Sequence, residues 1–563
     1  MTTLRILVLW TAAAALAPAQ LTTEQKLADF GHLAGLYAKQ YAPYEWKREL
    51  FGFDALRIGA WLERAARSRD DLEFYDVCIE YVASLRDTHD VYSLPSNFAA
   101  TLNFTVDIYD GRVLIDSINR ARLRPAEYPF EVGDELVSLD GKPVDQLLDE
   151  LAKYAVQANP RSLRRRAASR IVTRSQGRNP RAPEVGETAT VAIRRASGTL
   201  ETYRIPWTRT GVPLEVGPVP APKSVARPRA TAGDQQPEYL RALAELQTSM
   251  AAEPYAELGS GSRTPVYALP SGFVQRLGRV STDFFYSGTF RTHDYNIGYI
   301  RIPSYNPPSA TTALRQLEAE IVYFQENTDG LIVDQMRNPG GQLCFGEDVV
   351  ARLTPYDFRP TGYELRVTWS RVNSFYRNLT QARNQNADSW VIDLYEALYR
   401  DVSAAYRENR GRTGPVPLCG PGMTRTPATD RDGKMIAYTK PLMVIVDEFS
   451  SSTADSVPAM LQDARRAILF GMRTNGAGGT NTSTSLPAGA YSEGTAGMTL
   501  GLMTRAAPVA TPDYPTTYYI ENVGVRPDVE ADYMTRDNLL ERGRPFVEAF
   551  TQAMVGHIRR SGN

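Results

Sequence analysis

Histidine and cysteine are scarce in this chain, and its net charge is close to zero. The 563 residues include only four histidines and three cysteines, and the formal net charge is -1. A chain so close to neutrality has no global preference for nucleic acid or for an anionic membrane surface. Three cysteines form no disulfide framework, although an oxidising compartment permits one pair among Cys78, Cys344 and Cys419. We expect no metal site and no cofactor.

Long hydrophobic runs are also missing. The longest early run, residues 6–16, follows Arg5 and leads into the small residues Ala17-Pro18-Ala19. This layout predicts a secretory signal peptide over residues 1–19, with a buried N-terminal helix as the alternative. No later segment reaches the roughly 20 apolar residues of a membrane span. We therefore expect a secreted or periplasmic protein without a membrane anchor.

The chain is too long for one ordinary hydrophobic core, so two or three domains are expected. Residues 20–98 carry apolar residues at three- and four-residue spacing, which predicts a helical region. Residues 99–212 alternate around Asp-Gly turns, which predicts β-hairpins. Residues 213–265 are rich in Pro, Ala and Ser and indicate a linker or exposed loop with one short helix. Residues 266–550 alternate apolar strands with helices, which predicts an α/β core.

The β-rich part contains VGDELVSLDGKPV, residues 132–144, which resembles a PDZ module. Such modules bind extended peptides by adding a strand to a sheet. An arginine-rich stretch over residues 160–181 interrupts this part. We interpret it as a solvated helical insertion, because no aromatic residues alternate with the arginines as they would in a single-strand nucleic-acid site. A patch that binds polyanions is the alternative.

Two turns in the α/β part have sequences that favour a catalytic role. In PLMVIVDEFSSSTADSVPAM an apolar strand runs through a serine-rich turn into a helix, and Ser452 lies at that turn. Backbone N–H groups and the helix dipole there favour a developing oxyanion, although helix capping is the commoner role of serine taken alone. The second turn, residues 338–341, ends in Gly340-Gly341. Adjacent glycines let the backbone approach a ligand and point an N–H at it.

A serine nucleophile usually needs a base, and histidine is the commonest one. His89 lies in LRDTHDVYSLP, where a helix breaks into a loop flanked by acidic residues. His293 precedes the strand IGYIRIP, also in a loop, so both remain candidates on residue chemistry. For the carboxylate that orients the base, Glu521 and Asp528 both follow a strand-like run.

Taken together, these segments resemble the C-terminal processing, or tail-specific, protease family. IGYIRIPSY, GLIVDQMRNPGG, VDEFSSSTADSVPAMLQDARRAILFGMRTNGAGG and ENVGVRPD occur in that family's order, over roughly residues 75–530. The resemblance implies an α/β fold: a crotonase/ClpP-like β-α superhelical core, preceded by the helical region and the PDZ-like domain. Family members of the Ser–Lys type carry a lysine after the GxxTxG turn, but here Ala477 stands at that place. The chain is instead similar to the tricorn-core-like branch and to the chlamydial protease-like activity factor, which use Ser, His and Glu.

The resemblance also assigns roles, carried over position by position. The implied site consists of the nucleophile Ser452, the base His89, the orienting Glu521, and the oxyanion-hole N–H groups of Thr453 and of Gly340 or Gly341. Asp463 matches an acidic position of the Ser–Lys relatives, and without the lysine we interpret it as structural.

The expected function is that of an exported serine endopeptidase which hydrolyses protein or peptide substrates through an acyl-enzyme. The resemblance further implies a homodimer and a loop within residues 213–265 that keeps the enzyme latent. No nucleic-acid partner is expected. The alternative is a non-catalytic protein that binds peptides or apolar ligands, because this fold also carries such functions.

Overall fold

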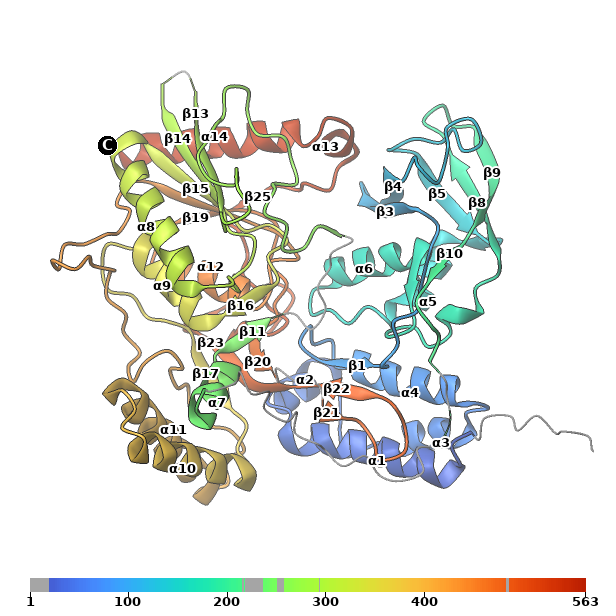
Figure 1. Ribbon diagram of the computed structural model, residues 1–563, viewed down its shortest axis with the longest axis horizontal. Coiled ribbons are helices and arrows are strands. Elements are labelled where there is room, and N and C mark those ends of the chain that lie inside the picture. The colour runs from blue at the N-terminus through green and yellow to red at the C-terminus, as the bar shows by residue number, and fades with distance from the viewer. Residues whose placement is uncertain are drawn as a thin grey trace, which may run out of the picture.

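The computed structural model describes residues 20–214, 217, 236–250, 258–292, 294–481 and 486–562. The expected signal peptide, His293 and most of the expected linker lie outside these residues. Within the described ranges, no helix combines the length and the hydropathy needed to cross a membrane. Figure 1 shows a large α/β body beside a second body made of the helical region and the PDZ-like sheet.

The region predicted to be helical forms α1 Thr23–Gln40, α2 Tyr44–Phe51, α3 Gly59–Arg67 and α4 Asp71–Ala83. The side chain of Thr22 caps α1 by accepting from the Gln25 N–H at 3.2 Å, and Asp70 caps α4. Aromatic rings fill the space between the helices, with Phe30 and Tyr81 fully buried and in edge-to-face contact. Packing of this kind stabilises helices that would be marginal alone.

The PDZ-like part is a sheet with the strand order β3-β4-β5-β8-β9. Its strands are β3 Phe104–Tyr109, β4 Arg112–Ile118, β5 Glu135–Leu139, β8 Thr188–Arg194 and β9 Leu200–Pro206, with β6 Lys142–Pro143 beside β5 and α5 Val144–Ala152 following. At the β3–β4 turn, Asp110 and Gly111 have φ angles of 48° and 76°. Positive φ at both positions is what a two-residue hairpin turn requires, so this predicted turn is confirmed.

The arginine-rich stretch is helical as predicted, but the expectation that it is solvated is wrong. It forms α6, Pro160–Val172, and most of its residues are buried. The Arg165 side chain is only 3% exposed and forms ion pairs with Asp107 on β3 and with Glu448, which precedes the serine turn. Carboxylates from both neighbours compensate the buried guanidinium, so the helix packs as a wedge between the PDZ-like sheet and the α/β body.

A seven-stranded sheet forms the α/β body, in the order β12-β13-β14-β15-β18-β19-β25. Its strands are β12 Val274–Gln275, β13 Tyr286–Arg291, β14 Asn296–Arg301, β15 Gly330–Asp334, β18 Leu442–Val446, β19 Ile468–Gly471 and β25 Val529–Glu530. The five strands from β14 to β25 are parallel. Strands that run parallel must be buried on both faces, as their continuous apolar sequences predict.

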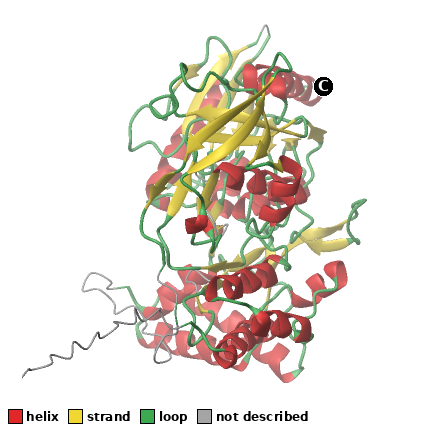
Figure 2. Cartoon of the chain, turned by 90° about the vertical axis from the view of Figure 1, so that its right-hand side faces the viewer, coloured by secondary structure: helices red, strands yellow, loops and turns green. Residues whose placement is uncertain are grey.

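Helices cover both faces of this sheet (Figure 2). On one face, Ile300 and Val333 belong to a core shared with α8 Ala310–Asn327, α9 Leu343–Leu353 and α12 Thr453–Asp463. On the other face, Tyr299 and Ile332 pack with α14 Arg544–Ser561. Neighbouring strand residues thus point to opposite cores, as the pleat requires.

Other elements extend the body. A second sheet joins β17 Gly362–Leu365, β20 Gly479–Asn481, β23 Thr499–Val509 and β24 Thr517–Tyr519, and a helical hairpin follows β17 as α10 Trp369–Asn384 and α11 Ser389–Arg407. Near the centre, α7 Glu238–Leu246 leads into β11 Thr248–Met250, which pairs with β16 Gly340–Gln342.

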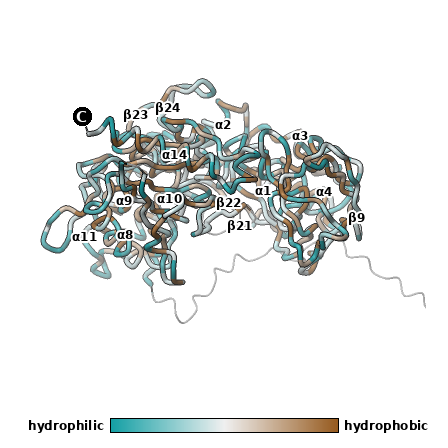
Figure 3. The backbone as a smooth tube through the Cα atoms, turned by 90° about the horizontal axis from the view of Figure 1, so that it is seen from above, coloured by the Kyte–Doolittle hydropathy of each residue, from teal (hydrophilic) through white to brown (hydrophobic). Residues whose placement is uncertain are grey.

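The two bodies are joined where a strand from the C-terminal half of the chain pairs with a strand that follows the helical region. Strand β1, Val91–Ser93, pairs with β22, Thr495–Gly497, which belongs to the C-terminal half of the chain. Viewed from above, α2, β21 (Leu486–Pro487) and β22 lie between the group containing α3 and α4 and the group containing α8 and α9 (Figure 3). The segment after α4, which carries His89, therefore enters the junction between the bodies.

Candidate active site

Ser452 lies at the junction of β18 and α12, in a fully buried turn. Its φ of 64° and ψ of -117° are unusual for a residue with a side chain. Backbone conformations of this kind cost energy and gather at functional sites. Ser452 is also the N-cap residue of α12, so the capping role and the nucleophile role fall on the same position.

His89 lies in the loop between α4 and β1, and the structure brings its imidazole to the serine. The His89 Nε2 atom is 2.9 Å from Ser452 Oγ, which is hydrogen-bond distance. Burial lowers the pKa of His89 to about 4, against an opposing effect of the Asp87 carboxylate. The imidazole is therefore neutral near pH 7 and able to accept a proton.

Glu521 follows β24 and is fully buried close to His89. Its Oε2 accepts from the Gly478 N–H at 2.8 Å, and its Oε1 is bonded to the ammonium of Lys47. Burial, together with Asp87, raises the pKa of Glu521 above its ordinary value, and Lys47 opposes that rise. A carboxylate oxygen has two acceptor sites, so these bonds leave capacity for the imidazole.

Asp87, His89 and Glu521 offer atoms that lie within 4.8 Å of one another. Such a set of donors could hold a metal ion, but the Lys47 ammonium already supplies a positive charge against Glu521. Asp87 supports the loop itself, since its Oδ1 accepts from the His89 N–H and its Oδ2 from the Tyr41 hydroxyl, both at 2.9 Å. The cluster has the composition of a base with its orienting carboxylates.

Gly340 and Gly341 are both candidates for the backbone N–H that binds an oxyanion. The Gly340 N–H donates to Asn338 Oδ1 at 2.9 Å, which leaves Gly341 as the better candidate for an oxyanion donor. Gly341 has a φ of 146°, and a Cβ there would meet the Tyr305 backbone at 2.3 Å, so a side chain does not fit. The Thr453 hydroxyl donates to the Gly341 carbonyl at 3.0 Å and ties α12 to β16.

Asp455 joins the serine turn to the turn over residues 471–476, which precedes Ala477. Its buried carboxylate accepts from the N–H groups of Ser452 at 2.8 Å, Gly476 at 2.8 Å and Ala477 at 2.9 Å. Ala477, the position of the lysine in Ser–Lys relatives, is buried in this arrangement. The lysine in the site comes from α2, and its bond goes to Glu521.

Two other acidic residues named from the sequence lie outside this cluster. Asp528, the alternative carboxylate, accepts from the Leu469 N–H at 2.8 Å within the sheet. Asp463 is ion-paired with Arg505, in agreement with its structural interpretation. His293 is not among the described residues.

Reasoning from the sequence missed three residues of the site: Lys47, Asp87 and Asp455. Asp87 and Asp455 stand beside predicted site residues, in RDTHD and SSTAD, and polar neighbours of a candidate could have been examined for support roles. Lys47 stands in YEWKRELF, an ordinary helical pattern that gives no signal.

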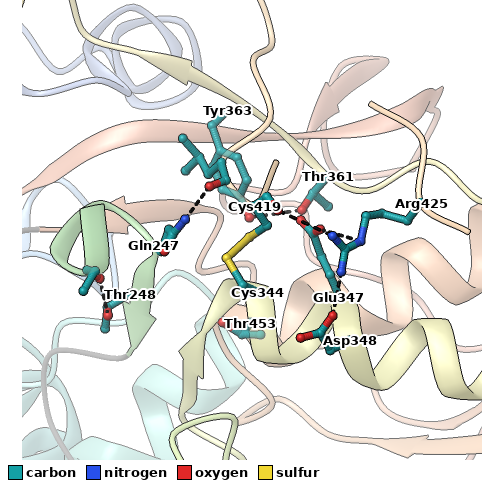
Figure 4. The surroundings of a disulfide bond; sticks show 12 residues. Gln247, Thr248, Cys344, Glu347, Asp348, Thr361, Tyr363, Cys419, Arg425 and Thr453 are labelled. Atoms are coloured by element: carbon teal, nitrogen blue, oxygen red, sulfur yellow. Dashed lines mark hydrogen bonds and ion pairs between the residues drawn. A yellow bond between two sulfur atoms is a disulfide. The ribbon is translucent and has the colours of Figure 1, made fainter. Parts of the chain in front are cut away.

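A disulfide lies beside the candidate oxyanion strand. Cys344, in the first turn of α9 directly after β16, is bonded to Cys419 (Figure 4). Gln247, the residue before β11, donates to the Leu418 carbonyl next to this disulfide at 2.6 Å. The third cysteine, Cys78, is a buried free thiol.

The model of peptidase family S41 matches residues 296–531, and that of a PDZ domain matches residues 99–214. The protein carries a family S41 peptidase domain. It is a serine peptidase with a PDZ domain before its core. Ser452 and Glu521 lie inside the matched S41 region, whereas His89 lies before both regions.

Similar proteins cover almost the whole chain. A Chlamydia trachomatis protein is 25% identical over 568 residues, with 92% of this chain and 90% of that protein covered. A Chlamydia pneumoniae protein is 24% identical over 581 residues, with 94% of this chain and 90% of that protein covered. The crystal structure of mature CPAF, the chlamydial protease-like activity factor, is similar with a TM-score of 0.74 and 23% identity, over 96% of this chain and 99% of that one. This likeness shows that the two proteins share a fold over most of the chain.

Proposed function

We propose that this S41 peptidase is an endopeptidase that hydrolyses peptide bonds through a triad of Ser452, His89 and Glu521. The observation that carries the assignment is the 2.9 Å separation between Ser452 Oγ and His89 Nε2. The two residues are 363 positions apart in the chain and meet in a buried site, next to a buried carboxylate cluster. Neither capping nor packing needs that contact.

The proposed chemistry is acyl transfer. His89 takes the proton of the Ser452 hydroxyl as Oγ attacks a peptide carbonyl, and Glu521 stabilises the imidazolium that forms. The N–H groups of Thr453 and Gly341 bind the oxyanion, each such donor contributing about 3 kcal/mol to the stability of the transition state. His89 then returns the proton to the leaving amine. Water, activated by the same imidazole, attacks the acyl-enzyme and frees Ser452.

Replacement of the nucleophile tests the proposal. Ser452→Ala is expected to abolish hydrolysis of a fluorogenic peptide substrate while the thermal unfolding midpoint stays within a few degrees of wild type, because only one oxygen is removed. A fluorophosphonate probe should label the wild-type protein at Ser452 and leave the variant unlabelled. Full turnover by the variant contradicts the triad. Absence of both labelling and turnover in the wild-type protein favours the alternative of a non-catalytic binding protein.

We also propose that the intact chain is latent. Strand β11 pairs antiparallel with β16, with Ser249 opposite Gly341 and Met250 opposite Gly340. An extended substrate would be expected to add to the same strand, since main-chain pairing is how sheets bind peptides. A segment of the chain itself therefore competes with substrate at the candidate oxyanion strand.

Export of the protein is a further part of the proposal. The N-terminal layout of residues 1–19 supports it, and so does the Cys344–Cys419 bond, because disulfides persist in oxidising compartments. Proteins or peptides are the proposed substrates.

A further inference from the structure

Lys47 is a lysine with no contact to solvent, in a site where no lysine was expected. It lies on α2, and its side chain is 0% exposed. Its ammonium donates to Asn522 Oδ1 at 2.7 Å, to the Arg86 carbonyl at 3.1 Å and to Glu521 Oε1. An ammonium has three N–H donors, so all of them are used. Lys47 therefore has no donor or lone pair left to act as the base for Ser452.

Helix α2 holds Glu521 at two points. The Trp46 indole N–H donates to the Glu521 backbone carbonyl at 2.9 Å, while Lys47, the next residue, binds the carboxylate. On the far side, the Gly478 N–H donates to Glu521 Oε2 at 2.8 Å. The side chain cannot rotate away from the imidazole unless one of these bonds breaks.

The charges around the imidazole are mostly negative. The titratable groups that face it or its loop are Asp87 and Asp90 of the loop, Glu521, Lys47 of α2, and the phenols of Tyr37 and Tyr41 of the first helix and its cap. Three buried carboxylates so close together repel one another, and a buried carboxylate without a partner takes up a proton. The Lys47 ammonium offsets that repulsion.

We propose that Lys47 is a positioning residue of the peptidase: its ion pair holds the Glu521 carboxyl group beside His89, so that the catalytic geometry depends on the docking of α2. The inference rests on the proposed function, since it concerns the same triad. It adds that the helical region contributes a second group besides His89, which acts through Glu521 and does not touch substrate.

The test is Lys47→Met, which keeps the length of the side chain and removes the charge. We expect kcat to fall at least about tenfold with little change in KM, because the lost group supports the transition state and not substrate binding. Lys47 is one of the groups that lower the pKa of His89, so its removal raises that pKa. The acid limb of kcat/KM should therefore move to higher pH. An unchanged kcat and an unchanged limb overturn the proposal.

Lys26→Met is the matched control. Lys26 is another buried lysine of the helical region, on α1, and it donates to the Ser68 carbonyl at 3.1 Å. Its loss should lower the unfolding temperature without moving the acid limb. If both variants shift the limb alike, the effect of Lys47→Met is one of general stability, and the proposal fails. In a Glu521→Gln background, Lys47→Met should cost no further activity, because the group through which it acts is gone.

A second readout separates this inference from the proposed function. In the Ser452→Ala protein, the imidazole of His89 can be titrated by NMR, and Lys47→Met should raise its pKa. If the wild-type protein has no peptidase activity, the proposed function fails while this titration still decides the role of Lys47. If Lys47→Met does not fold, Lys47→Gln, which keeps two N–H donors and loses the charge, must shift the titration in the same direction.

Discussion

His89, the proposed base, is held away from water, and this burial sets the pH range in which it can work. An exposed imidazole has a pKa of about 6.5 and is half protonated there. Burial disfavours the charged form, so His89 stays neutral down to about pH 4. The same burial makes the imidazolium of the transition state costly, which is why charged partners such as Glu521 matter at this site.

We therefore predict that the acid limb of kcat/KM lies near pH 4, well below the value of about 6.5 for an exposed histidine. The pH profile of peptide hydrolysis by the wild-type protein measures it. Asp87→Asn removes a charge that raises the pKa of His89, so its limb should move lower, opposite to the expected effect of Lys47→Met. A wild-type limb near pH 6.5 would mean that the working base is not this buried imidazole.

Sequence reasoning reaches some of these residues and not others, for a physical reason. Ser452 stands in a strand–turn–helix pattern, and Gly340-Gly341 form a double glycine. Each of these local patterns indicates a functional role by itself. Lys47 meets Glu521 474 positions away along the chain, and nothing in its local pattern distinguishes it from an exposed helix lysine. A residue whose role comes from a distant partner leaves no local signal.

At the scale of elements, turn chemistry was the most informative signal. The Asp110-Gly111 turn located the β3–β4 hairpin because its φ angles suit few other residues. The arginine-rich pattern predicts helix α6 but not its burial, since the partners of Arg165 come from a distant strand and loop. The α10–α11 hairpin was not predicted, although Val372, Phe375 and Leu379 recur at helical spacing on α10 and are buried.

The pairing of strand β11 with β16 should limit access to the candidate site. Ser249→Pro removes a backbone N–H opposite Gly341 and should weaken the pairing with β16. We expect faster fluorophosphonate labelling and a higher kcat/KM on a short peptide, because the competing strand leaves the site more often. Ser249→Ala keeps the backbone N–H and serves as the control. Equal rates for the proline variant, the alanine variant and wild type would show that β11 does not limit access.

At the scale of the whole molecule, the candidate site forms only where separate parts of the chain meet. The helical region brings His89 and Lys47, and the α/β body brings Ser452 and Glu521. The PDZ-like part reaches the same turn through α6, because Arg165 is bonded to Glu448, four residues before Ser452. Loosening any of these contacts should affect catalysis before it affects the stability of the separate parts.

The Cys344–Cys419 disulfide bears on that assembly and on the compartment in which it forms. The bond joins residues 75 positions apart and lies next to β16 and the entry to β11 (Figure 4). In the chain-entropy model, a closed loop of that length stabilises the folded state by roughly 4 kcal/mol. The double variant Cys344→Ala/Cys419→Ala should therefore lose about that much free energy of unfolding in urea.

Reductant distinguishes the disulfide from other effects of these substitutions. Dithiothreitol should bring the wild-type protein close to the double variant and should leave the double variant unchanged, because its only cysteine is a thiol. Cys78→Ala keeps the disulfide and so should keep the response to reductant. A wild-type protein that unfolds at the same urea concentration with and without reductant would show that the bond contributes nothing, and would remove one of the two supports for export. A large loss on reduction instead ties the stability of the peptidase body to an oxidising compartment, where structural disulfides persist.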